Sequence, residues 1–180
     1  MPSANPSIDE MLAAVPRLRA FAMSLSGNMD RADDLVQETL TRALANFDSF
    51  KPGTNLTAWL FTILRNHFYS EYRKRRREVE DVDGKHSGSL KSQPEQMGHL
   101  EMEEFRAALD KLPDDQREAL ILVGATGFSY EEAAKICGCA VGTIKSRLSR
   151  GRAQLARMLD VKDDSDFGPD AQTRSVLSDS

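Results

Sequence analysis

Residues 129–157 read SYEEAAKICGCAVGTIKSRLSRGRAQLAR and predict two helices joined by a tight turn. Ser129 and Glu132 have the spacing of a capping box, in which each side chain accepts a hydrogen bond from the backbone amide of the other residue. The first helix is therefore expected to begin at Tyr130. Gly138 suits the positive φ of a tight turn because it has no Cβ. The segment thus indicates a helix, a turn and a second helix.

Small and apolar side chains indicate how these two helices pack. Ala134 is small enough for a second helix to cross closely, and Ile144 and Leu148 lie one turn apart, where they can seat that helix against the first. With the capping box and the turn glycine, this spacing predicts a helix-turn-helix. Ala140 is expected at the N-cap of the second helix, where the missing side-chain cap costs about 1 kcal/mol relative to Ser or Asp.

The second helix is expected to bind DNA. It has no acidic residue from Val141 through Met158, although the 180-residue chain carries a net charge of −4. Basic and small polar side chains on one helix suit the phosphates and base edges of the major groove. The expected DNA-facing residues are Thr143, Lys145, Ser146, Arg147, Ser149, Arg150 and Arg152. The alternative is a solvated basic helix in a helical hairpin.

Apolar residues recur at helical spacing from Ile8 to Tyr72, so the N-terminal half is predicted to be all helical. Pro16 is expected to begin a second helix at its N1 position, and Gly27 to end that helix. The first apolar stripe consists of Ile8, Met11, Leu12 and Val15.

A further helix is predicted from Asp30, as its N-cap, to Phe47. Its buried stripe is expected to contain Leu35, Val36, Thr39, Leu40, Ala43 and Phe47. Its opposite side carries Asp33, Asp34, Gln37, Glu38 and Thr41. By composition this side is a solvated face, since acidic first turns suit the helix dipole. A metal site is disfavoured, because no nearby His or second acidic helix accompanies Asp34 and Glu38.

Residues 50–55 read FKPGTN and predict a loop. A long helix is expected from Leu56 to Arg77, ending in the basic run YRKRRR at residues 72–77. Aromatic side chains and arginines together suit the stacking of unpaired bases and the pairing of phosphates. Taken singly, the aromatic residues Trp59, Phe61 and Phe68 are more typical of a core.

Composition divides the chain into a helical domain at 8–77, an acidic linker at 78–98, a second helical domain at 99–159 and an acidic tail at 160–180. Pro113 separates two of the helices expected in the second domain. The linker and the tail contain too few apolar residues to fold, so both are expected to be disordered. Extended at ~3.3 Å per residue, the linker could span roughly 70 Å. The expected fold class is all-α, with two small helical domains joined by a flexible acidic linker.

Other function classes are disfavoured by composition. Hydrophobic residues make up 40% of the chain, yet no window approaches the ~20 apolar residues of a membrane helix, and residues 1–6 lack the basic start of a signal peptide. A cytoplasmic protein is therefore expected. Cys137 and Cys139 are too close for a disulfide and too few for a zinc site. Because no phosphate loop, nucleophile elbow or catalytic carboxylate pair is present, neither an enzyme nor a cofactor is expected.

From roughly Ile8 to Leu159 the chain resembles bacterial sigma factors of the extracytoplasmic-function type. Residues 33–39, DDLVQET, resemble region 2.2, and residues 58–66, AWLFTILRN, resemble regions 2.3 to 2.4. Residues 141–152, VGTIKSRLSRGR, resemble the recognition helix of region 4.2. The run RKRRREVED at residues 73–81 further resembles the alphaproteobacterial general stress response subgroup, whose anti-sigma factor is of the NepR type.

The resemblance implies three partners: core RNA polymerase through its β′ and β subunits, promoter DNA, and an anti-sigma factor. It implies that polymerase is bound by Asp33, Asp34, Gln37, Glu38 and Thr41. It implies −10 DNA contacts by Lys51, Thr54, Asn55, Arg65, Asn66, Tyr69, Arg73, Arg75 and Arg76, and −35 contacts by the seven residues named on the basic helix. The loop at residues 50–55 resembles the family element that captures a base flipped from the −10 strand, an event that costs a few kcal/mol.

Two alternatives accompany this interpretation. A self-sufficient helix-turn-helix regulator would need a dimer to bind two half-sites, and no convincing dimerisation heptads are visible. A sigma mimic that titrates an anti-sigma factor should have lost the basic residues and lie beside a receiver domain. This chain keeps the basic residues and has no room for a receiver.

Overall fold

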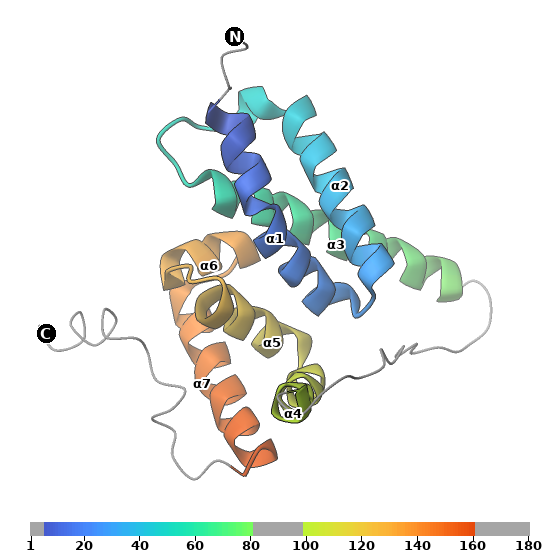
Figure 1. Cartoon of the computed structure of the whole chain (residues 1–180), viewed down its shortest axis with the longest axis vertical. Helices are drawn as coiled ribbons and strands as arrows, with labels where there is room; N and C mark the ends of the chain where they lie inside the picture. The colour runs from blue at the N-terminus through green and yellow to red at the C-terminus, as the bar shows by residue number, and fades with distance from the viewer. Residues whose placement is uncertain (1–5, 81–98, 161–180) are drawn as a thin grey trace, which may run out of the picture.

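The computed structural model describes residues 6–80 and 99–160, and within those ranges the fold is built from helices without strands (Figure 1). The N-terminal half contains α1 (Pro6–Ser26), α2 (Met29–Ala45), a short 3-10 helix η1 (Phe47–Ser49) and α3 (Leu56–Glu80). The C-terminal half contains α4 (His99–Asp110), α5 (Asp114–Leu120), a π-helical turn η2 (Ile121–Ala125), α6 (Tyr130–Cys137) and α7 (Val141–Met158). The all-α prediction is confirmed. The predicted linker and tail fall almost entirely outside the described residues.

α1 is one helix where the sequence predicted two. Pro16 lies inside it and not at the start of a second helix. A proline cannot donate to the carbonyl four residues earlier, but Pro16 and Leu12 both lie on the exposed side, where water can replace the lost bond. Burial keeps the helix continuous, because Met11 on one side of the proline and Leu18 on the other belong to the same core. Gly27 ends the helix as predicted, with φ +65°.

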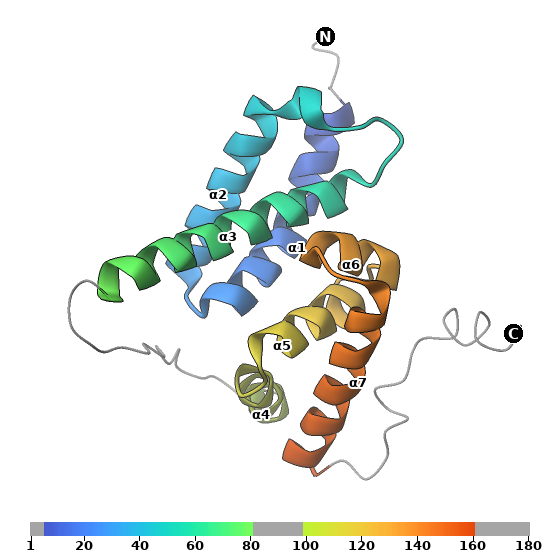
Figure 2. The same ribbon diagram turned by 180° about the vertical axis from the view of Figure 1, so that it is seen from behind.

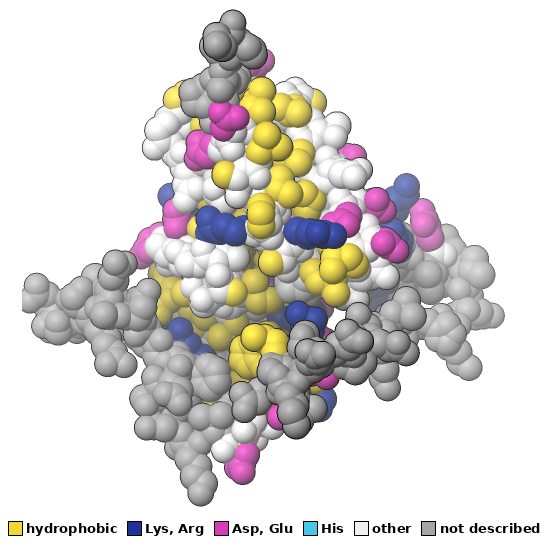
Figure 3. Space-filling view, in the orientation of Figure 1, with side chains coloured by type: hydrophobic (Ala, Val, Ile, Leu, Met, Phe, Trp, Pro, Cys, Tyr) yellow, Lys and Arg dark blue, Asp and Glu magenta, His cyan; other side chains and the backbone are white. Residues whose placement is uncertain are grey.

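The predicted apolar stripe at the start of α1 is partly wrong. Met11 is buried, whereas Ile8 and Leu12 are 44% and 59% exposed. Leu44 of α2 is also exposed. Figure 3 shows apolar side chains gathered over α1 and α2. Ala14, which the sequence analysis did not include, takes the buried position.

α2 begins two residues before the predicted start. Asn28, not Asp30, is the N-cap, and its side-chain oxygen accepts from the Arg31 amide at 2.9 Å. Asp30 lies in the first turn, where its charge suits the positive end of the helix dipole. Phe47 falls in η1, beyond the end of α2. The remaining stripe is buried or half-buried as expected.

Three phenylalanines connect the two halves of the chain. Phe61 of α3 stacks on Phe21 of α1 with ring centroids 5.0 Å apart. Its edge-on contact with Phe128, just before α6, has a centroid distance of 4.9 Å. Buried residues from both halves therefore form one continuous apolar cluster. Figure 2 shows the consequence, with α6 lying against α3 although about 70 residues separate them in sequence.

The helices α5 and α7 pack closely at Gly151. A Cβ built at Gly151 would lie 2.8 Å from Leu120 Cδ1 and 3.3 Å from Leu120 Cγ. At Gly142, in the first turn of the same helix, a Cβ would meet nothing within 4 Å. A side chain at Gly151 would therefore collide with Leu120 of α5 unless Leu120 moved.

We expect Gly151→Ala to lower the melting temperature relative to Gly142→Ala. Alanine favours a helix by up to about 1 kcal/mol over glycine at either position. At Gly151 that gain is opposed by displacement of Leu120, and overpacking of this kind costs about 1–3 kcal/mol. Thermal unfolding followed by circular dichroism checks the difference. Equal melting temperatures for the two variants would mean that Leu120 moves aside at no cost.

Candidate nucleic-acid interface

The helix-turn-helix formed by α6 and α7 matches the sequence prediction. Ser129 Oγ accepts from the Glu132 amide at 3.1 Å, and Glu132 Oε2 accepts from the Ser129 amide at 3.0 Å. Gly138 adopts φ +64° at the turn, and Ala140 caps α7 without a side-chain hydrogen bond. Ile144, at the centre of the α7 contact with α6, is fully buried. The outer face of α7 is thereby held in a fixed orientation.

That outer face is polar and basic. Lys145, Ser149 and Arg150 are exposed; Lys145 and Ser149 lie one turn apart on α7, and Arg150 follows Ser149. Thr143, Ser146 and Arg152 border them and are half-buried. The ammonium of Lys145 lies 6.0 Å from the centre of the Tyr130 ring, which restrains it at the start of α6.

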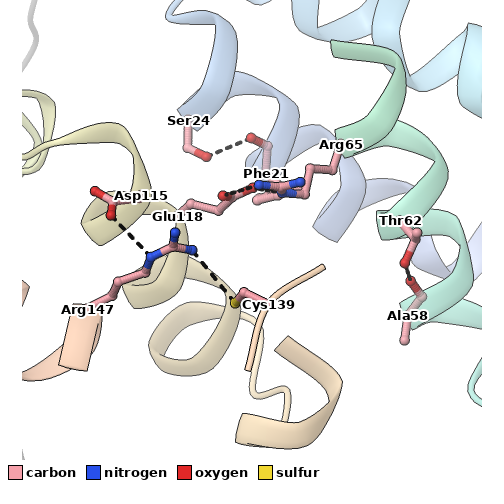
Figure 4. Close-up of polar contacts among 9 residues, drawn as sticks. All are labelled: Phe21, Ser24, Ala58, Thr62, Arg65, Asp115, Glu118, Cys139 and Arg147. Carbon is pink, nitrogen blue, oxygen red and sulfur yellow. Dashed lines mark hydrogen bonds and ion pairs between the residues drawn. The ribbon is translucent and has the colours of Figure 1, made fainter. Parts of the chain in front are cut away.

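Arg147 occupies a different position from the other six predicted residues of α7. Its Nε lies 3.1 Å from Asp115 Oδ2, and its Nη1 lies 3.8 Å from Cys139 Sγ (Figure 4). Only 22% of the side chain is exposed. Arg147 therefore fastens α7 to α5 and to the turn, and it presents little surface to a ligand.

Arg65 of α3 makes a bidentate ion pair with Glu118 of α5. The Nε to Oε1 distance is 2.6 Å and the Nη2 to Oε2 distance is 3.2 Å (Figure 4). Glu118 is 1% exposed and the Arg65 side chain 19%. Burial alone would lower the pKa of Arg65, but the hydrogen bonds and charge of Glu118 outweigh it, so the pKa is raised. The guanidinium remains charged, and its Nε and Nη2 atoms are bound to Glu118.

Tyr69 lies one turn beyond Arg65 and under its guanidinium, which is 4.7 Å from the ring centre. Burial, with the nearby Glu118 charge, raises the pKa of Tyr69 to about 12. The phenol is therefore neutral at ordinary pH. Two of the residues predicted to face DNA are thus turned toward the C-terminal half.

Asn55, in the loop before α3, also contacts the C-terminal half. Its amide nitrogen donates to Glu132 Oε1 at 2.6 Å, and its oxygen accepts from the Ala58 amide at 3.1 Å. Burial would raise the pKa of Glu132, but hydrogen bonds from Ser129 and Asn55 outweigh it and lower the pKa. Glu132 therefore caps α6 and holds the loop at the same time.

The other predicted residues of the loop and α3 face solvent. Thr54 Oγ1 donates to the Lys51 carbonyl at 2.7 Å, and both residues are exposed. Asn66 and Arg73 line a shallow groove of about 500 Å³ beside Trp59. Arg75 and Arg76 are exposed on the last turns of α3, where Arg75 lies 3.9 Å from Glu71. Of the nine predicted residues, three therefore lie at the contact with the C-terminal half, where Asn55 is still exposed and Arg65 and Tyr69 are half-buried, and the other six lie away from it.

A second groove, of about 570 Å³, runs between α2 and α3. Of the five residues predicted on the polar side of α2, four line it: Asp34, Gln37, Glu38 and Thr41. Glu38 pairs with Arg42 at 2.6 Å within the helix. Asp33 faces α1 instead and pairs with Arg19 at 2.6 Å. The α3 wall contributes His67, Glu71 and Arg75.

Arg31 also lines this groove and was not predicted from the sequence. Its guanidinium lies 5.6 Å from the centre of the Phe68 ring, and two of its nitrogen atoms are buried without a hydrogen-bond partner. Burial, together with the nearby Arg75 charge, lowers its pKa. No sequence pattern marks Arg31, because it becomes part of the groove only when α3 packs across α2.

Comparisons with known proteins match each half of the chain to a family model. Residues 12–78 match the family model for sigma-70 region 2, and residues 102–155 match the model for sigma-70 region 4. The ECF RNA polymerase sigma factor EcfG of Rhodopseudomonas palustris (strain TIE-1) is 71% identical over 177 residues, 98% of each chain. This chain belongs to the extracytoplasmic-function sigma factors, in the EcfG-like group.

Two solved sigma factor structures are similar to this one. The sigma factor RpoE in complex with the anti-sigma factor NepR from Bartonella quintana is 58% identical, with a TM-score of 0.79 over 86% of this chain and 97% of that one. CnrH in complex with the cytosolic domain of CnrY is 28% identical, with a TM-score of 0.65 over 89% of this chain and 93% of that one. The region 2 match begins within α1 and ends within α3, and the region 4 match begins within α4 and ends within α7, so we refer to α1–α3 as region 2 and to α4–α7 as region 4.

The described parts of this sigma factor contain no group of three or more residues suited to a metal ion. Burial, with the nearby Glu118 charge, raises the pKa of Cys137 to about 12, so its thiol is protonated and packs as a small apolar group. Among the described residues, no helix is long and apolar enough to cross a membrane.

The acidic partners of the predicted DNA-binding residues were also not predicted from the sequence. Glu118 and Glu132 were not considered as contacts of region 2, although Glu132 was identified as a cap. Both contacts join residues more than 50 positions apart. Helical periodicity carries no signal for such pairs, because it describes only one helix at a time.

Proposed function

We propose that this sigma factor binds core RNA polymerase, recognises −35 and −10 promoter elements and helps to melt DNA, serving genes of the general stress response under the control of an anti-sigma factor. In this role it is a DNA-recognition subunit without catalytic activity of its own, and it acts in the cytoplasm. The observation that carries the proposal is the exposed basic face of α7 on a capped helix-turn-helix, joined to a region 2 whose α3 ends in exposed arginines.

Neither alternative is favoured. A stand-alone regulator does not account for region 2, and a mimic has no use for the exposed Lys145 and Arg150. Run-off transcription with purified core polymerase tests the proposal most directly. A sigma factor directs synthesis from a defined start site, whereas a stand-alone regulator or a mimic leaves core polymerase without one.

We propose that α7 enters the −35 major groove with Thr143, Lys145, Ser146, Ser149, Arg150 and Arg152 toward DNA. The geometry of Arg147 suits a supporting role, because Asp115 already occupies its guanidinium. The −10 element is assigned to Lys51, Thr54, Asn55, Arg65, Asn66, Tyr69, Arg73, Arg75 and Arg76. We assign the binding of core polymerase to the four predicted α2 residues that line the groove, Asp34, Gln37, Glu38 and Thr41. Asp33, which pairs with Arg19, is assigned a smaller contribution.

Arg150→Ala should weaken promoter use and relax base choice at the −35 element, because base contacts specify the sequence. Arg157→Ala is the matched control on the same helix. The Nε atom of Arg157 donates to the Ala153 carbonyl at 3.3 Å. This variant should cause a smaller loss that is independent of sequence, as expected of a phosphate contact. Run-off transcription on a series of mutated −35 elements measures both. Identical profiles for the two variants would contradict this assignment.

Asp34→Lys combined with Glu38→Lys should abolish co-elution with core polymerase by reversing the charge of the groove on α2. The melting temperature should change little, since exposed ion pairs such as Glu38 with Arg42 contribute about 0–1 kcal/mol. Asp33→Lys reverses a charge on the α1 side of the same helix and should have a weaker effect. If the double variant still co-elutes with core polymerase, Asp34 and Glu38 belong to a solvated helix face and not to an interface.

The proposed anti-sigma factor is a small protein of the NepR type that contacts both regions. The similar RpoE structure, which holds NepR, supports this partner. A partner that binds the closed arrangement would shift the population away from the form that binds polymerase. The chain should therefore form a complex with a NepR-type protein in size-exclusion chromatography and lose core polymerase when that protein is in excess. Simultaneous binding of both partners would contradict this mechanism.

A further inference from the structure

The groove between α2 and α3 contains an arginine whose hydrogen bonds are incomplete. The Nε and Nη2 atoms of Arg31 are buried and donate to no acceptor. Buried donors without an acceptor are costly, and in a native structure they call for an explanation. The ring of Phe68, whose centre is 5.6 Å from the guanidinium, gives Arg31 a cation–π contact and no oxygen acceptor. These two donors are therefore not used within the part of the chain that the structure describes.

Arg75 of α3 adds a second guanidinium to the same groove. Because α3 lies across α2, Arg31 of one helix and Arg75 of the other both line the groove (Figure 2). Burial lowers the pKa of Arg31, and the positive charge of Arg75 lowers it further. Arg75 itself is exposed, and its ion pair with Glu71 is long at 3.9 Å. A negatively charged acceptor between the two arginines would be attracted by both.

The arginines at the end of α3 are divided between two grooves. Arg73 lines the groove beside Trp59, whereas Arg75 lines the groove against α2. Residues two positions apart in an α-helix differ in direction by about 200°, so they lie on opposite faces. Lys74, between them, lines neither groove. The basic run therefore does not form one surface, and Arg75 belongs with α2.

The charges of the groove against α2 decide which class of ligand suits it. Besides His67, its ionisable residues are three arginines and three carboxylates: Arg31, Arg42, Arg75, Asp34, Glu38 and Glu71. A DNA strand, which carries negative charge alone, would meet the carboxylates. A protein segment with both acidic and basic side chains can match both signs. Since Arg42 already pairs with Glu38 at 2.6 Å, an acidic side chain would be bound by Arg31 and Arg75.

We propose that Arg31 and Arg75 form an anion-binding pair that holds an acidic side chain of core polymerase in the groove between α2 and α3. The inference rests on the proposed function, which assigns polymerase binding to the α2 residues of this groove. It gives Arg75 a contact with protein in place of a contact with the −10 element. The polymerase carboxylate supplies acceptors to Arg31, while basic side chains of the same segment meet the carboxylates of the groove.

The test compares Arg31→Met with the matched control Lys74→Met in the full-length chain. Methionine is flexible and apolar and can keep the contact with Phe68, but it has no N–H donor. Lys74→Met removes the same charge at an exposed position that lines neither groove. Anisotropy of the fluorescein-labelled sigma factor, titrated with purified core polymerase, measures the affinity. Circular dichroism measures the melting temperature of each variant.

Arg31→Met should bind core polymerase about tenfold more weakly than the Lys74→Met control, as expected when a charged hydrogen bond is lost. Its melting temperature should equal or exceed that of the wild type, because an apolar side chain replaces a buried guanidinium with unpaired donors. A structural role of Arg31 would instead lower the melting temperature. Arg31→Lys should bind with intermediate affinity, since lysine keeps the charge and loses the planar fork.

Arg75→Met makes the test independent of folding at residue 31, because Arg75 is exposed. It should also bind core polymerase more weakly than Lys74→Met. Affinities of Arg31→Met and Arg75→Met equal to that of the control would overturn the proposal. So would loss of affinity for a single-stranded −10 DNA 12-mer with unchanged affinity for core polymerase, since the pair would then bind nucleic acid.

The wild-type chain in the same titration distinguishes failure of this inference from failure of the proposed function. If the wild type binds core polymerase and both arginine variants match the control, only the anion-binding pair is refuted. If the wild type does not bind core polymerase, the proposed function fails and this inference fails with it.

Discussion

The packing of Phe61 between Phe21 and Phe128 joins the two halves of the chain and determines how they meet. Phe21 and Phe61 belong to region 2 and Phe128 to region 4, so one aromatic row passes through both. Two halves of this size each have a small core, and sharing one core buries apolar surface that neither half could cover alone. The apolar contact brings α6 to α3 and sets which polar groups meet there.

Because the aromatic row brings the two regions together, the polar groups around it must be paired. Glu118 could not remain buried without a partner, and Arg65 supplies one from the opposite region. Removing either partner would leave a buried charge, which is far more costly than losing an exposed ion pair. A pair of this kind contributes to specificity, since it forms only when the two regions adopt one relative arrangement. It also ties up an arginine that sequence reasoning assigned to DNA.

The recognition helix is positioned by a different set of constraints. Gly151 lets α7 approach Leu120 closely, Arg147 binds Asp115, and the left-handed turn at Gly138 sets the angle between α6 and α7. These contacts lie within region 4 and do not involve region 2. The orientation of α7 is therefore set within region 4, whereas the surroundings of Arg65 on α3 are set by the packing of the two regions.

Features that depend on neighbours a few positions apart could be predicted from the amino-acid sequence alone. The capping box at Ser129, the turn at Gly138 and the exposed basic face of α7 are local, so spacing and residue type were enough to predict them. Local rules failed at Pro16, where burial on both sides of the proline holds one helix together. The pairing of Arg65 with Glu118 could not be predicted in this way, because it follows from the packing of two apolar surfaces that are distant in sequence.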